Sequence, residues 1–80
     1  MTYYECIAGD GKMHFYFHCS EDDNQEINNL AISGLIERDF WMLKKQFNFG
    51  VTINRWSPTK KQWVFFSKRL INPNDFKFEA

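Results

Sequence analysis

The sequence predicts an α+β fold in which one antiparallel four-stranded sheet carries helix on one face. Two segments, 3–19 and 50–70, are rich in strand-forming residues and have a turn signal in the middle, which indicates two hairpins. The segment between them, 20–48, has neither Pro nor a strong β run, which favours helix. The predicted order is ββ-α-ββ, and 80 residues suffice for one small domain, 1–80.

The first hairpin is predicted from the Asp-Gly pair at its tip. Asp10 and Gly11 suit a type I′ turn, which needs positive φ at both central residues. This turn fixes a register with an apolar face, which pairs Ala8 with Met13, Cys6 with Phe15, and Tyr4 with Phe17. The opposite, mixed face pairs Ile7 with His14, Glu5 with Tyr16, and Tyr3 with His18.

The helical segment begins at polar residues and changes phase halfway. Asp23 and Glu26 have the spacing of a capping box, with Ser20 as the alternative N-cap. One apolar stripe consists of Ile27, Leu30, Ala31 and Leu35, and a second, nearly opposite stripe consists of Ile36, Phe40, Leu43 and Phe47. The change falls near Ser33-Gly34, where Gly34 could close a first short helix. The prediction is therefore one kinked helix or two short helices, with a break or kink near that point.

The second hairpin turns at residues 57–60, where Pro58 occupies the second position of a type I turn. Strict alternation from this turn gives an apolar face of Val51, Ile53, Val64 and Phe66. It gives a far face of Thr52, Asn54, Trp56, Trp63 and Phe65, with Lys61 and Arg69. Phe76 and Phe78 alternate with polar residues after a turn at 72–75, so a short fifth strand at the C-terminus stays open.

The far face of the predicted sheet gathers five aromatic side chains: Tyr3, Tyr16, Trp56, Trp63 and Phe65. An exposed aromatic patch of this kind is typical of a binding site, because Tyr and Trp dominate interface hot spots. Three alternatives stay open for this face. The tail or a second helical piece covers it, a homodimer buries it, or a different partner binds it.

Residue patterns for catalysis, cofactors and metals are lacking. His14 and His18 lie about 13 Å apart on one strand, too far to share a metal ion. Cys6 and Cys19 are expected to be buried free thiols, with Cys6 on the face opposite His14. The two glycines beside Asp10 are explained by the turn, and the sequence contains no glycine-rich phosphate-binding loop. We therefore expect no enzyme, no cofactor and no metal.

Charge is divided along the chain, although its total is zero. Residues 1–37 carry seven acidic residues and one Lys, a net −6, whereas residues 38–80 carry a net +6. Basic and aromatic residues alternate in the second hairpin. Together with Tyr16 they give the predicted partner-binding residues: Tyr16, Arg55, Trp56, Lys60, Lys61, Trp63, Phe65, Lys68 and Arg69. Basic residues beside stackable rings are also typical of RNA- or single-stranded-DNA-binding surfaces.

The functional expectation is a small non-enzymatic module that binds a protein with an acidic or mixed surface. RNA or single-stranded DNA is the alternative partner, and a homodimer through the open sheet face is a further one. The excess of Phe, Tyr, Met, Ile, Asn and Lys over Gly, Ala, Arg and Pro, 35 against 12, indicates an AT-rich gene. That origin suggests a phage- or mobile-element-encoded inhibitor, for example of a host defence complex. No apolar membrane span and no signal core occur, so we expect a cytoplasmic protein.

Overall fold

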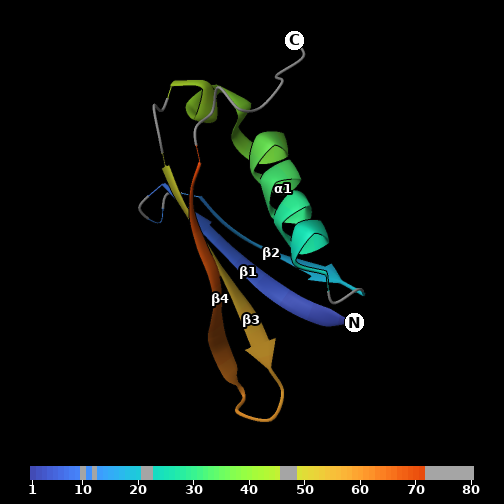
Figure 1. The fold of residues 1–80 in the computed structure, drawn as a ribbon. Helices are drawn as coiled ribbons and strands as arrows, with labels where there is room; N and C mark the ends of the chain where they lie inside the picture. The colour runs from blue at the N-terminus through green and yellow to red at the C-terminus, as the bar shows by residue number, and fades with distance from the viewer. Residues whose placement is uncertain (10, 12, 21–22, 46–48, 72–80) are drawn as a thin grey trace.

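The computed structural model is a four-stranded antiparallel sheet with one helix packed against it (Figure 1). It describes residues 1–9, 11, 13–20, 23–45 and 49–71, of which 39–45 and 49 are described by backbone alone. The elements in chain order are β1 (Thr2–Ala8), β2 (Met13–Cys19), α1 (Asn24–Lys45), β3 (Phe49–Ser57) and β4 (Gln62–Ile71). The predicted α+β class and ββ-α-ββ order are confirmed.

The register of the first hairpin is the predicted one. All six predicted pairs occur, from Ala8 with Met13 to Tyr3 with His18, and the strands end on a seventh, Thr2 with Cys19. Gly11 has φ +87°, the left-handed conformation that the turn requires and that glycine adopts without steric cost. Asp10 lies outside the described residues.

The two hairpins lie side by side in the sheet, because the strand order is β2-β1-β3-β4. The central pair, β1 and β3, is antiparallel and places Cys6 opposite Ile53 and Ala8 opposite Val51. These four side chains are fully buried on the helix side of the sheet. The hairpins therefore do not interleave, and the two edges of the sheet are β2 and β4.

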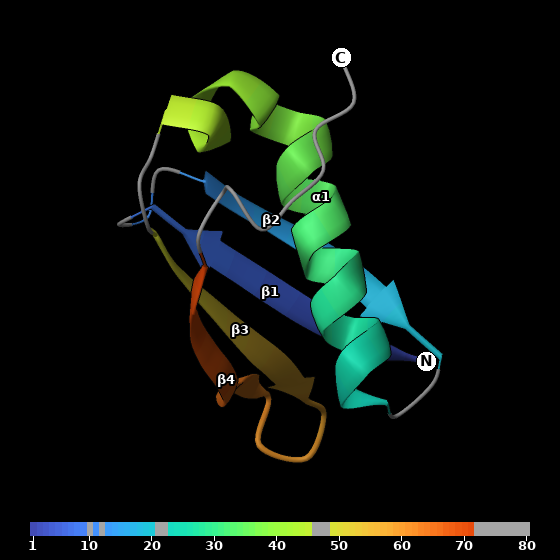
Figure 2. The same ribbon diagram turned by 45° about the horizontal axis from the view of Figure 1, so that its top comes forward.

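Helix α1 runs without interruption through Ser33 and Gly34, so the single helix is the predicted form that occurs. Asp23 caps its start, because the Asp23 Oδ1 accepts a hydrogen bond from the Gln25 N–H at 2.9 Å. Because the helix continues past Gly34, this residue does not close a first short helix. Figure 2 shows that the last, yellow-green turns of α1 change direction relative to the preceding ones.

Gly34 is instead the point where the helix approaches the sheet most closely. A Cβ atom built on Gly34 would lie 2.5 Å from Cε2 and 2.6 Å from Cζ of the buried Phe15. The guanidinium of Arg38 lies over the same ring, with its Cζ 4.2 Å from the ring centroid. Its Nη1 also donates to the Gly34 carbonyl at 3.3 Å. Glycine is required here because a larger side chain would clash with Phe15, and not because the helix ends at this residue.

The hydrophobic core lies between α1 and the sheet (Figure 2). From the first predicted stripe, Ile27, Ala31 and Leu35 are fully buried and Leu30 packs beside them. Ile36 of the second stripe is half-buried, while the side chains of its other members lie outside the described ones. Cys6 and Cys19 are both buried, and neither is joined in a disulfide within the described part of the chain. No helix in the described part of the chain combines the length and apolarity needed to cross a membrane.

The second hairpin closes through a four-residue loop between Ser57 and Gln62, which form its last pair. The Ser57 carbonyl accepts a 2.7 Å hydrogen bond from the Lys61 N–H, and Lys61 has φ +54°. Further along, Asn54 pairs with Phe65 but Ile53 pairs with Ser67. The intervening residue, Phe66, therefore forms a β-bulge.

The bulge reverses the predicted alternation in the second half of β4. Arg69 pairs with Val51 and so lies on the helix side, whereas the sequence predicted it on the far face. Lys68 takes a far-face position opposite Thr52. Leu70 is consequently 74% exposed, and Ile71 is buried. Strict alternation failed because one extra residue shifts every later side chain to the other face. The predicted fifth strand, 76–79, lies outside the described residues.

Candidate functional site

The helix-free face of the sheet carries the predicted aromatic residues on all four strands. We call Tyr3, Tyr16, Trp56, Trp63 and Phe65 the aromatic face. The register explains their grouping, because Trp56 pairs directly with Trp63. Glu5 pairs with Tyr16 on one side and Asn54 on the other, and Asn54 pairs with Phe65. Three of these side chains are more than half exposed, at 53% for Tyr3, 56% for Tyr16 and 64% for Phe65.

Rings from the two edge strands meet over the middle of this face. Tyr16 on β2 and Trp63 on β4 stack with centroids 5.5 Å apart and an interplanar angle of 29°. Trp56 meets Trp63 edge-on at 5.3 Å. Because β1 and β3 separate the edge strands, Tyr16 and Trp63 lean toward each other across both. Together with Tyr3 these rings line an open hollow of about 420 Å³.

A buried carboxylate lies under this aromatic cover. Glu5 is 8% exposed, and its Oε1 accepts a 2.8 Å hydrogen bond from Asn54 Nδ2. Its Oε2 lies 2.9 Å from Nε2 of His14, whose ring is 5.0 Å from that of Tyr16. The carboxylate thus ties β2, β1 and β3 together on this face. A buried carboxylate is tolerated because both its oxygens are hydrogen-bonded.

Sequence reasoning did not identify this Glu5 network. The predicted register of the first hairpin did place Glu5 opposite Tyr16, so the face on which Glu5 lies was predictable. Its contact with the Asn54 amide was not, because that contact depends on the pairing of β1 with β3, which no local turn determines. The network supports the aromatic rings from below.

The predicted basic residues do not form one surface. Arg55 lies on the helix side, where its guanidinium is 4.7 Å from the Phe66 ring centroid and 5.5 Å from that of Tyr4. Its pairing with Val64 places it there, away from the aromatic face, and the far-face position predicted for Arg69 is wrong. Lys60 and Lys61 are exposed in the loop, and Lys68 is exposed on the far face.

The buried Cys6 thiol is poorly suited to nucleophilic chemistry. Burial raises the pKa of Cys6 to about 12, although the nearby Arg38 charge lowers it in part. A thiol with such a pKa is protonated at neutral pH and is a poor nucleophile. Within residues 1–9, 11, 13–20, 23–45 and 49–71, no three His, Cys, Asp or Glu side chains are grouped to hold a metal ion.

Comparison with known proteins returned no match, whether to protein families, to curated proteins or to solved structures.

Proposed function

We propose that this protein is a small non-enzymatic module that occupies the surface of a partner protein through its aromatic face. The observation that carries the proposal is the hollow lined by Tyr3, Tyr16, Trp56 and Trp63 on a face that α1 does not cover. Exposure of large apolar side chains to water is unfavourable, and their burial against a partner lowers the free energy of the system. Trp and Tyr are also the residues that most often supply hot-spot affinity.

The charge around the face favours a partner with an acidic or mixed surface. Residues 49–71 carry five basic residues and no acidic one. Lys60, Lys61 and Lys68 are exposed, the first two in the loop that follows Trp56. Such charges steer encounter and orient the docked complex more than they add affinity. Following the AT-rich composition, we also propose that the protein is an inhibitor encoded by a phage or mobile element, for example one that blocks a host defence complex.

The test is a binding measurement with matched surface variants. Affinity purification from the native host with mass spectrometry supplies the partner, and titration then compares the double variant Trp56→Ala/Trp63→Ala with Leu70→Ala. Leu70 is an exposed apolar residue on the same side of the sheet, outside the hollow. The double variant should bind about 30-fold more weakly or worse, and Leu70→Ala should bind normally.

Folding of the double variant is checked by circular dichroism and urea unfolding. If it does not fold, Tyr3→Ala and Tyr16→Ala replace it, because both side chains are more than half exposed. Unchanged partner affinity in folded variants would exclude the aromatic face. A stable homodimer that dissociates on Trp63→Ala would assign the face to a second copy of the chain.

Binding of RNA or single-stranded DNA is a second candidate, favoured by the wholly basic charge of residues 49–71 beside Trp56 and Trp63. Bases stack on aromatic rings while Lys and Arg contact phosphates. A labelled oligothymidine should then bind at low salt, with an affinity that falls steeply as salt rises. A shallow salt dependence with the protein partner, and no oligonucleotide binding at low salt, would exclude this candidate.

A further inference from the structure

The β2 edge of the sheet is a second surface, separate from the aromatic face. β2 lies at the end of the strand order, with β1 as its strand neighbour. In an antiparallel edge strand, alternate residues direct their N–H and C=O groups outward. Among the described residues, the backbone hydrogen bonds outside helix and ladders join Ile27 to Asp23 and Lys61 to Ser57. None of these lies on the outer edge of β2.

The two edges of the sheet are protected very differently. β4 carries a bulge at Phe66 and exposed charges at Lys68 and Arg69, features that discourage pairing with another strand. β2, from Met13 to Cys19, contains no charged residue, Pro or Gly, and its register is regular along its whole length. A regular, uncharged edge is a ready template for an added strand.

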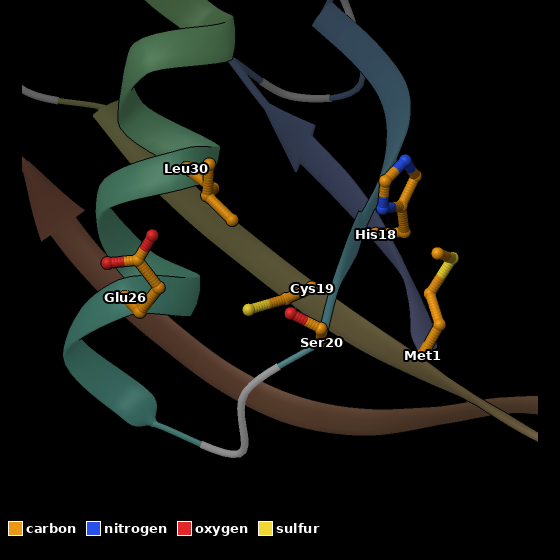
Figure 3. A pocket seen from close by; sticks show the side chains of 6 residues that line it. All are labelled: Met1, His18, Cys19, Ser20, Glu26 and Leu30. Carbon is orange, nitrogen blue, oxygen red and sulfur yellow. The ribbon is translucent and has the colours of Figure 1, made fainter.

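A groove runs between this edge and the helix. It has a volume of about 270 Å³ and is lined by Met1, His18, Cys19, Ser20, Glu26 and Leu30. Figure 3 shows Glu26 and Leu30 on α1 across the space from the end of β2, with the Cys19 side chain directed toward the helix. A strand paired with β2 would therefore place the helix-side residues of one of its ends at this groove.

The residues that line the groove include one acidic side chain and neither Lys nor Arg. Glu26 lies in the groove wall, and Asp23 is exposed at the start of α1. An acidic segment would be repelled at this end of β2, whereas a Lys or Arg would pair with Glu26.

We propose that the β2 edge binds an extended segment of a partner protein by antiparallel strand addition. The segment carries apolar side chains at its helix-facing positions, which pack against Leu30. At its N-terminal end it carries a Lys or Arg facing Glu26, because an antiparallel segment places that end beside His18 and Ser20. Main-chain hydrogen bonds supply affinity, and the groove selects the alternate side chains.

The probe is a fluorescein-labelled peptide, Lys-Thr-Val-Thr-Ile-Thr, with blocked ends, titrated into the full chain at physiological salt. It should bind and should slow hydrogen exchange of β2 amides. A peptide with Glu in place of the Lys should bind about two- to fivefold more weakly. A peptide with Pro at its centre should not bind, because Pro cannot donate to the ladder.

Matched charge reversals on α1 test the position. Glu26→Lys should weaken the Lys peptide about two- to fivefold and strengthen the Glu peptide. Glu37→Lys is the control, because Glu37 is exposed on the same helix about 16 Å further along, beyond the screening length. Lys has nearly the helix propensity of Glu, so both variants are expected to fold, which circular dichroism checks.

Several results would overturn the proposal. These are no binding at millimolar peptide, equal binding of the Pro-containing peptide, unprotected β2 amides in the complex, or equal effects of the two charge reversals. Self-association that protects β2 amides, without peptide binding, would assign the edge to a second copy instead. Trp56→Ala/Trp63→Ala should leave peptide affinity unchanged, so failure here and failure of the aromatic-face proposal are distinguishable.

Discussion

Gly34→Ala is expected to lower the free energy of unfolding, although alanine is the better helix former. In a solvent-exposed helix interior the same substitution would stabilise by about 1 kcal/mol. Here the new Cβ would lie 2.5 and 2.6 Å from two atoms of the Phe15 ring, where ordinary carbon contacts are about 3.5–4.0 Å. The ring would have to retreat by about 1 Å, yet it is buried and Arg38 lies over it.

The magnitude follows from these two opposing effects. Overpacking of a buried site costs about 1–3 kcal/mol, from which the gain in helix propensity is subtracted. The net loss expected for Gly34→Ala is about 1 kcal/mol. For a domain of this size that loss lowers the melting temperature by about 4–8 °C.

The assay is urea unfolding followed by tryptophan fluorescence and far-ultraviolet circular dichroism. Ser33→Ala is the matched control, because Ser33 is the exposed neighbour in the same helix and should gain a few tenths of a kcal/mol. In a Phe15→Leu background the cost of Gly34→Ala should disappear, giving a coupling energy of about 1 kcal/mol or more. The reasoning is refuted if Gly34→Ala stabilises like Ser33→Ala, or if the coupling is zero.

Further predictions concern the buried thiol, the buried carboxylate and the first turn. Because burial raises the pKa of Cys6 from 9.0 to about 12, a disulfide-exchange reagent at pH 8 should label this thiol only after unfolding. The unfolded thiol ionises first, so stability should fall from pH 9 toward 12, and fall less steeply in Cys6→Ala; equal slopes would contradict this. Glu5→Leu should cost about 1–2 kcal/mol in urea unfolding, because two donors lose their acceptor. His14→Ala should cost less, because the His14 side chain is 42% exposed; the reverse order would be inconsistent with a buried carboxylate. Gly11→Ala should cost about 1–2 kcal/mol through φ alone, since no atom lies within 4 Å of the new Cβ, and an unchanged melting temperature would refute this.

Local signals were sufficient for much of the fold. The Asp-Gly turn fixed the register of β1 and β2, because the position and length of a hairpin turn determine which residues pair across the two strands. Alternation from the second turn placed Trp56 and Trp63 on one face, and the structure pairs them directly. It failed beyond the bulge at Phe66, because an inserted residue has no turn to mark it. For that reason Arg69 was predicted on the wrong face of the sheet.

The candidate site was predictable in composition but not in arrangement. Alternation placed Tyr3, Tyr16, Trp56 and Trp63 on one face of the sheet. It could not show that Tyr16 and Trp63, from opposite edges, stack on each other, because that requires knowing which hairpin strands are neighbours. The Glu5–Asn54 hydrogen bond was invisible for the same reason.

The sequence by itself determined the elements, their order, the first register and the aromatic composition of the far face. These depend on turn chemistry and on the two-residue period of strands, which act between residues close in the chain. The tertiary structure alone decided that β1 pairs with β3, that Gly34 serves packing against Phe15, and that Glu5 is buried beneath the aromatic rings. Each of these joins residues far apart in the chain, and such contacts depend on how whole faces fit together rather than on any local pattern.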